Sequence, residues 1–190
     1  EIRDGRPYYR GYLDLCDSGI TSLPEGFTVG GSLNLAGTGI TSLPEGLAVG
    51  GGLNLYGTGI TSLPEGLTVG GYLNLCDSGI TSLPNGLTVG GSLDLRDIGI
   101  ISLPDGLIVG GNLDLENCTG ITSLPEDLTV GGTLYLENCT GITSLPDGLI
   151  VGGDLYLHNS SITSLPNGLK VGGYIDLRGT GITALPEELV

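Results

Sequence analysis

Residues 63–82 read LPEGLTVGGYLNLCDSGITS, and this segment recurs with small changes along almost the whole chain. Residues 11–190 contain nine copies, each marked by one proline: Pro24, Pro44, Pro64, Pro84, Pro104, Pro125, Pro146, Pro166 and Pro186. The period is 20 residues, and it rises to 21 in residues 111–131 and 132–152, where ENCTGI replaces shorter forms such as AGTGI. A fixed period of this length indicates a solenoid in which each repeat forms one turn.

Six apolar positions recur in every full repeat, and in the second repeat they are Leu33, Leu35, Ile40, Leu43, Leu47 and Val49. Alternation in the LxL segment sends its two leucines to the core and the residue between them outward, which predicts a β-strand of three to four residues. The proline after the last leucine of ITSLP disfavours helix and favours an extended or polyproline-like return segment. Glycine pairs such as those at 50 and 51 suit tight corners where a side chain would meet the next turn.

The sequence therefore predicts two regions, a flank over residues 1–10 and a nine-turn solenoid over residues 11–190. The solenoid is expected to have short parallel strands on one face, extended return segments and little or no helix. The inserted residue of the two longer repeats is expected to lie in a loop, outside the core.

The spacing of the LP pair, the strand leucines and the later isoleucine in residues 63–82 resembles the short, LPX-type leucine-rich repeats of bacterial effectors of the YopM and IpaH types. The resemblance covers residues 11–190 and implies a leucine-rich-repeat solenoid from a secreted bacterial protein. A secreted or extracellular location is therefore favoured over a cytoplasmic one. The ligase activity of the IpaH type resides in a separate domain and is not implied here.

One column departs from that family, which usually carries asparagine shortly after the strand. Here the column reads Ser18, Thr38, Thr58, Ser78, Ile98, Cys118, Cys139, Ser160 and Thr180. Hydroxyl and thiol groups can bond to the buried backbone groups that need partners there. Ile98 cannot, so its turn is expected to differ locally. Cys118 and Cys139 lie in neighbouring turns, where buried free thiols are favoured over a bridge, and Cys16 and Cys76 are expected to be free.

Composition and motifs argue against several classes of function. The formal net charge is −15, so nucleic acid and anionic membrane surfaces are poor partners, and no apolar run is long enough for a membrane span. His158 is the only histidine, and no nucleophile or cofactor motif accompanies it, so we expect no catalysis, cofactor or metal. Asp94 and Asp114 share an outward column and leave an acid pair or a Ca²⁺ site as an alternative, although Asn54 in the same column favours ordinary polar positions. The sequons at residues 117–119, 138–140 and 159–161 are explained by the repeat itself.

The most variable surface is the strand face, which comprises the residue before each LxL segment, the residue between its leucines and the residue after it. Six of the eight tyrosines lie in these columns: Tyr12, Tyr56, Tyr72, Tyr135, Tyr156 and Tyr174. Tyrosine is common at binding surfaces because it gives large contact area at a small entropic cost. The predicted partner-binding residues are Asp114, Glu116, Tyr135, Glu137, Tyr156, His158, Tyr174 and Arg178.

These observations predict a non-catalytic protein–protein interaction scaffold whose acidic, tyrosine-containing strand face binds a protein with a basic patch. One alternative is a structural protein that forms homo-oligomers or fibres by stacking its solenoid ends. A lesser alternative is ice binding through the hydroxyl row formed by Thr21, Thr41, Thr61, Thr81, Thr122, Thr143, Thr163 and Thr183.

Overall fold

The LxL segments form the first of two parallel sheets, which we call the leucine sheet. Its nine strands, one from each repeat, are β3 (Leu13–Asp14), β5 (Leu33–Asn34), β7 (Leu53–Asn54), β9 (Leu73–Asn74), β11 (Leu93–Asp94), β13 (Leu113–Asp114), β15 (Leu134–Tyr135), β17 (Leu155–Tyr156) and β19 (Ile175–Asp176). Each strand pairs in parallel with those of the neighbouring turns, Leu33 opposite Leu53 for example. The strands are shorter than predicted because the carbonyl of a residue such as Leu35 turns inward, where it accepts the N–H of Thr38.

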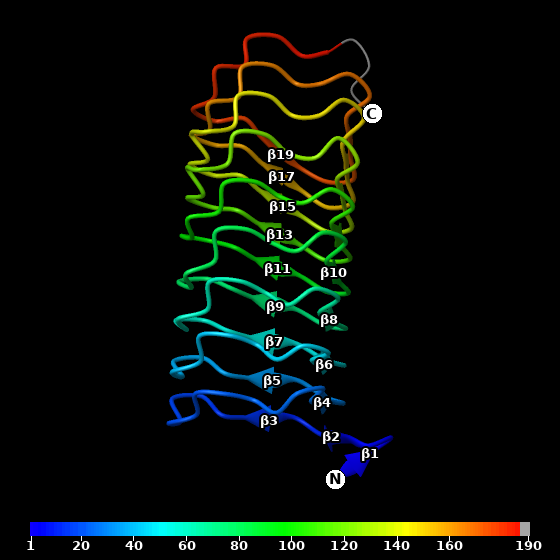
Figure 1. Cartoon of the computed structure of the whole chain (residues 1–190). Coiled ribbons are helices and arrows are strands. Elements are labelled where there is room, and N and C mark those ends of the chain that lie inside the picture. Colours follow the sequence, from blue (N-terminus) through cyan, green and yellow to red (C-terminus); the bar gives the residue numbers. More distant parts are fainter. Residues whose placement is uncertain (187–190) are drawn as a thin grey trace.

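This computed structural model describes residues 1–186, and within that range it is a solenoid of parallel strands without helix (Figure 1). Nine strands in the leucine sheet complete eight full turns from the first to the last. The predicted class of fold, a repeat solenoid with little or no helix, is confirmed. The last four residues of the region predicted as solenoid lie outside the described residues. No helix in the described part is long and apolar enough to cross a membrane.

A second sheet, the valine sheet, was not assigned from the sequence. Its strands are β1 (Ile2–Arg3), β2 (Arg6–Tyr9), β4 (Thr28–Val29), β6 (Ala48–Val49), β8 (Thr68–Val69), β10 (Thr88–Val89), β12 (Ile108–Val109), β14 (Thr129–Val130), β16 (Ile150–Val151) and β18 (Lys170–Val171). In each of its turns the valine points into the core and the residue before it points outward. Strand β1 runs antiparallel to β2, and β2 pairs in parallel with β4, so residues 1–9 form a hairpin that extends this sheet.

The glycine pair between the two sheets forms the corner of each turn. Gly70 N–H donates to the carbonyl of Val49 at 2.9 Å, and Gly71 N–H donates to that of Gly51 at 2.9 Å. A Cβ atom at Gly70 would overlap the carbonyl oxygen of Gly50 in the preceding turn. Only glycine therefore allows successive turns to approach this closely, as the sequence predicted.

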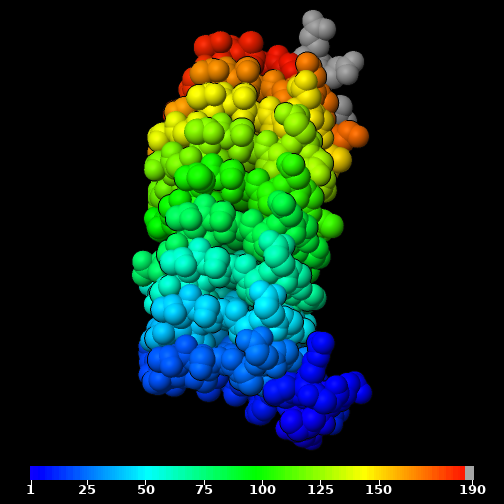
Figure 2. Space-filling model, viewed as in Figure 1, coloured from blue at the N-terminus to red at the C-terminus, as the bar shows by residue number. Residues whose placement is uncertain are grey.

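The six apolar columns form one continuous core along the stack. All six predicted core residues of the second repeat are buried: Leu33, Leu35, Ile40, Leu43, Leu47 and Val49. Most of their equivalents in the first repeat, such as Leu13 and Ile20, are only partly buried because they have a neighbour on one side alone, whereas Val29 is fully buried beneath β2. Figure 2 shows the result as a rod of stacked bands, each band being one turn. Each turn is therefore stabilised mainly by the turns on either side of it.

The residue that follows the strand face begins a tight turn with positive φ, between 53° and 69° in all nine repeats. Only glycine, aspartate and asparagine occupy this position, because other side chains clash with their own backbone in that conformation. Asn117, Asn138 and Asn159 stack there: Asn138 Nδ2 donates to Asn117 Oδ1 at 3.0 Å, and Asn159 Nδ2 donates to Asn138 Oδ1 at 3.4 Å. The asparagines of the three sequons therefore hold neighbouring turns together. The inserted residues Thr119 and Thr140 are exposed in this loop, outside the core, as predicted.

The threonines and cysteines of the hydroxyl and thiol column make the inward bonds expected of them, whereas the side-chain hydroxyls of Ser18, Ser78 and Ser160 form none. Thr58 Oγ1 donates to the Leu55 carbonyl at 2.7 Å, and the buried thiol of Cys118 donates to the Leu95 carbonyl of the preceding turn at 2.9 Å. Leu95 belongs to the turn of Ile98, whose buried side chain offers no donor. Cys139 makes the same bond one turn later, from its thiol to the Leu115 carbonyl at 2.9 Å, so this contact belongs to the two cysteines and is not specific to the turn of Ile98. All four cysteines are free thiols, and Cys118 and Cys139 are buried.

Candidate functional site

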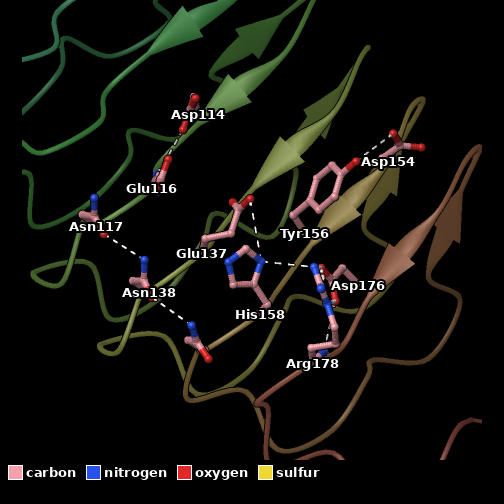
Figure 3. Close-up of polar contacts among 11 residues, drawn as sticks. Asp114, Glu116, Asn117, Glu137, Asn138, Asp154, Tyr156, His158, Asp176 and Arg178 are labelled. Atoms are coloured by element: carbon pink, nitrogen blue, oxygen red, sulfur yellow. Dashed lines mark hydrogen bonds and ion pairs between the residues drawn. The ribbon is translucent and has the colours of Figure 1, made fainter.

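The strand face of the later turns carries the eight predicted partner-binding residues on β13, β15, β17 and β19 and beside them. Figure 3 shows six of these residues: Asp114, Glu116, Glu137, Tyr156, His158 and Arg178. Parallel pairing places Asp114 beside Tyr135, Tyr135 beside Tyr156, and Tyr156 beside Asp176. The eight side chains are not equally accessible. Tyr174 and Arg178 are exposed, Glu137 is buried, and the other five are partly buried.

Three of these residues form an aromatic row along the solenoid axis. The rings of Tyr135 and Tyr156 are parallel to within 3°, with centroids 5.2 Å apart. Tyr174 continues the row with its ring tilted by 56° and its centroid 6.2 Å from that of Tyr156. The hydroxyl of Tyr156 donates to Asp154 Oδ2 at 3.4 Å. Stacking of this kind restricts the motion of the two rings.

In the other seven turns, the residue in the column of Tyr135 and Tyr156 makes a hydrogen bond to the backbone. There the residue is asparagine or aspartate, and its side-chain oxygen accepts the backbone N–H two residues later at 3.0–3.2 Å. This contact secures the chain as it leaves the strand. Asp114 makes it with the N–H of Glu116 at 3.1 Å. Tyrosine has no acceptor in the right place, so the turns of Tyr135 and Tyr156 lack this bond.

The first charged cluster of the strand face is centred on Arg96, which the sequence did not place among the binding residues. Arg96 makes two hydrogen bonds to Asp94, 3.0 Å from Nε to Oδ1 and 2.7 Å from Nη2 to Oδ2, and its Nε lies 3.3 Å from Asp114 Oδ2. Burial raises the pKa of Asp114 to about 6, and the neighbouring Asp94 charge adds to this while Arg96 opposes it. The two aspartates form a shared ion pair with one arginine, which accounts for the acid pair seen in the sequence.

The second cluster contains Glu137, His158, Asp176 and Arg178 (Figure 3). Arg178 donates to both oxygens of the fully buried Asp176, with Nη2 2.6 Å from Oδ2. His158 Nδ1 lies 3.5 Å from Asp176 Oδ2 and 4.0 Å from Glu137 Oε1. Hydrogen bonds from Arg178 lower the pKa of Asp176 to about 2, whereas burial raises the pKa of Glu137. Asp176 was missed from the sequence, although it shares the column of Asp94 and Asp114.

The charges of these clusters differ in how far they are neutralised. Asp94, Asp114 and Asp176 are paired with Arg96 or Arg178, whereas Glu116 forms no ion pair among the described residues. One oxygen of Glu137 and Nδ1 of His158 are buried without a hydrogen-bond partner. The strand face therefore presents aromatic rings beside carboxylates that keep unused acceptor capacity.

Among the described residues, no serine or cysteine forms a hydrogen bond with His158, and the buried thiols of Cys118 and Cys139 lie in the core. Within residues 1–186, no three histidine, cysteine or acidic side chains are arranged to hold a metal ion. Comparison with models of known protein families, with curated proteins and with solved structures finds no match for this chain.

Proposed function

We propose that this protein is a non-catalytic interaction scaffold that binds a partner protein through the strand face of its later turns. The observation that carries the proposal is the replacement of asparagine or aspartate by tyrosine at positions 135 and 156. Both turns forgo a backbone hydrogen bond that every other turn makes, and in exchange they present a preformed aromatic stack. Local rules of a fold are broken most often at functional sites.

The chemistry of the partner follows from the charges around this stack. The chain carries a net charge of −15, and the carboxylates of Asp114 and Asp154 lie beside Tyr135 and Tyr156. A partner with a basic patch would be steered toward this surface, and arginine side chains would find both carboxylates and ring faces to contact. The proposal includes a leucine-rich-repeat relationship and a secreted or extracellular location, which rest on the resemblance of residues 63–82 to effector repeats.

The two alternative functions have less support. The threonine column of the ice-binding alternative is exposed in every turn where it occurs, but Ile101 interrupts it in the fifth. End-to-end assembly needs complementary solenoid ends, and the residues after 186 lie outside the described structure. Neither alternative explains why tyrosine replaces the anchoring residue in two neighbouring turns.

Affinity capture with matched baits tests the proposal. The wild-type chain is compared with a double variant, Tyr135→Ala and Tyr156→Ala, and with a control in which Thr122 and Thr143 on the return side become alanine. We expect a partner that the wild type and the control retain and the tyrosine variant loses. With that partner purified, the double variant should bind more weakly by about 2 kcal/mol or more. Equal capture by the tyrosine variant, or loss only in the threonine control, would show that another face binds.

A further inference from the structure

The ring of His158 lies between two carboxylates of the strand face and forms a hydrogen bond with neither. Its Nδ1 atom lies 3.5 Å from Asp176 Oδ2 in the following turn and 4.0 Å from Glu137 Oε1 in the preceding turn (Figure 3). This atom is buried, and it has no hydrogen-bond partner among residues 1–186. A nitrogen without a proton would turn its lone pair toward both carboxylates, whereas a protonated ring would offer each of them a positive charge. The geometry around His158 therefore favours a proton on its ring.

Glu137 is the second incompletely satisfied group of this cluster. It is only 8% exposed, and its Oε2 atom is buried without a hydrogen-bond partner in the described part of the chain. Burial raises the pKa of Glu137, and the charges of Glu116 and Asp114 add to this effect, while a backbone hydrogen bond and His158 oppose it. A buried carboxylate keeps its charge at least cost when a cation lies beside it. The ring of His158 is the group placed to become that cation.

The net charge of the cluster depends on a single proton. Arg178 forms an ion pair with Asp176, with Nη2 2.6 Å from Oδ2, and with no other carboxylate in residues 1–186. Two carboxylates and one guanidinium leave one negative charge uncompensated when His158 is neutral. Histidine ordinarily gains a proton between pH 8 and 5, and a proton on His158 makes the cluster neutral.

The other titratable groups around His158 respond to pH in different ways. Hydrogen bonds to its guanidinium partner lower the pKa of Asp176 to about 2, so this carboxylate stays charged above about pH 4. Burial raises the pKa of Tyr156, which precedes the ring on β17, so its hydroxyl stays neutral. Asp114, with a pKa of about 6, changes its charge in the same range as histidine but lies two turns away. Between pH 8 and 5 the proton of the cluster is therefore held by His158 together with Glu137.

From these observations we infer that His158 is a pH-dependent switch in the strand face, which holds a basic partner more tightly at neutral pH than at about pH 5.5. This inference rests on the proposed function, because it concerns the regulation of the same surface. His158 follows Tyr156 by two residues, so a proton on its ring removes a negative charge beside the aromatic row. A partner cation that contacts this row is then attracted less strongly.

NMR of the free chain tests the switch without a partner. His158 is the only histidine, so its ring signals report its protonation without ambiguity. Between pH 7.5 and 5.5 we expect the side-chain carboxyl carbon of Asp176 to shift together with the ring signals, although Asp176 itself stays charged. In the variant His158→Gln the Asp176 signal should remain in place. The inference is overturned if the Asp176 signal does not move in the wild type, or if it moves equally in the variant.

Binding of the captured partner at the same two pH values tests the consequence for the strand face. On acidification the affinity of the wild type should fall at least threefold further than that of His158→Gln. Asp114→Asn removes the distant group that titrates in this range, and its affinity should fall nearly as far as that of the wild type. Titration of the partner itself is common to all three proteins and cancels in the comparison.

The two measurements separate the switch from the proposed function. Equal falls in affinity for the wild type and His158→Gln overturn the switch, while binding at pH 7.5 that depends on Tyr135 and Tyr156 leaves the proposed function standing. If no binding at pH 7.5 depends on these tyrosines, the proposed function fails and the regulation of partner binding fails with it. The Asp176 signal then still shows whether His158 takes up the proton of the cluster.

Discussion

Single residues in this protein are best understood by comparing each with its equivalents in the other turns. Asp114 shows how one side chain serves several tasks: it accepts the N–H of Glu116, contacts Arg96 and contributes charge to the strand face. The anchoring bond needs only an oxygen, since Asn54 and Asn74 make it without charge. The negative charge of Asp114 is therefore separable from its structural task.

The pKa of Asp114 gives a prediction with a definite sign. Its folded value of about 6 lies above the ordinary value near 3.9, so the folded state binds this proton more tightly. The contribution of Asp114 to stability therefore increases as the pH falls from 7 to about 4. Asp114→Asn should raise the free energy of unfolding at pH 7 by about 1–2 kcal/mol, and the gain should disappear near pH 4. Urea denaturation of both proteins across this pH range measures it.

The pKa of Asp176 is shifted in the opposite direction from that of Asp114. Its folded pKa of about 2 lies below the ordinary value, so its stabilising effect is complete above about pH 4 and is lost as the pH falls through 2. Asp176→Asn should therefore destabilise the chain at pH 7. If Asp114→Asn also destabilised it equally at every pH, the ion pair with Arg96 would outweigh the cost of burying the Asp114 carboxylate.

At the scale of the element, the sequence predicted the leucine strands, their parallel stacking and the glycine corners, but not the valine sheet. The LxL segment predicts a β-strand because two leucines flank one variable residue. The valine strand has only one inward residue before the glycine pair, and so short an alternation carries little periodic signal. Its strands are nevertheless paired in register from Tyr8 and Thr28 onward along the stack.

The corner glycines predict a sharp contrast between Gly70, which directly follows β8, and Thr68 within that strand. Gly70→Ala should lower the free energy of unfolding by about 2 kcal/mol or more, because its Cβ overlaps the carbonyl oxygen of Gly50. Thr68→Ala, two residues away, should change it by less than about 0.5 kcal/mol, since Ala48 already occupies the equivalent exposed position. Thermal denaturation of the two variants compares them directly. An equal loss in both would show that the corners tolerate a side chain.

For the whole molecule, the repeats made the fold predictable from the sequence, but one part of the candidate site became visible only in the structure. Columns that are the same in every repeat hold residues that each turn needs in order to fold. Columns that vary indicate where individual turns have a further role. The tyrosines and carboxylates of the strand face could be found in this way. Asp176 was missed, because only the structure shows its buried contacts with Arg178 and His158.

The central claim is that Tyr135 and Tyr156 serve partner binding at the expense of the anchoring hydrogen bond. The double variant Tyr135→Asn and Tyr156→Asn restores the residue type that the other turns use, and its binding to the captured partner should be measured alongside its unfolding in urea. The account predicts stability within about 1 kcal/mol of the wild type, since the regained hydrogen bonds offset the lost ring stacking, and affinity at least tenfold weaker. Unchanged affinity in a folded double variant would contradict it.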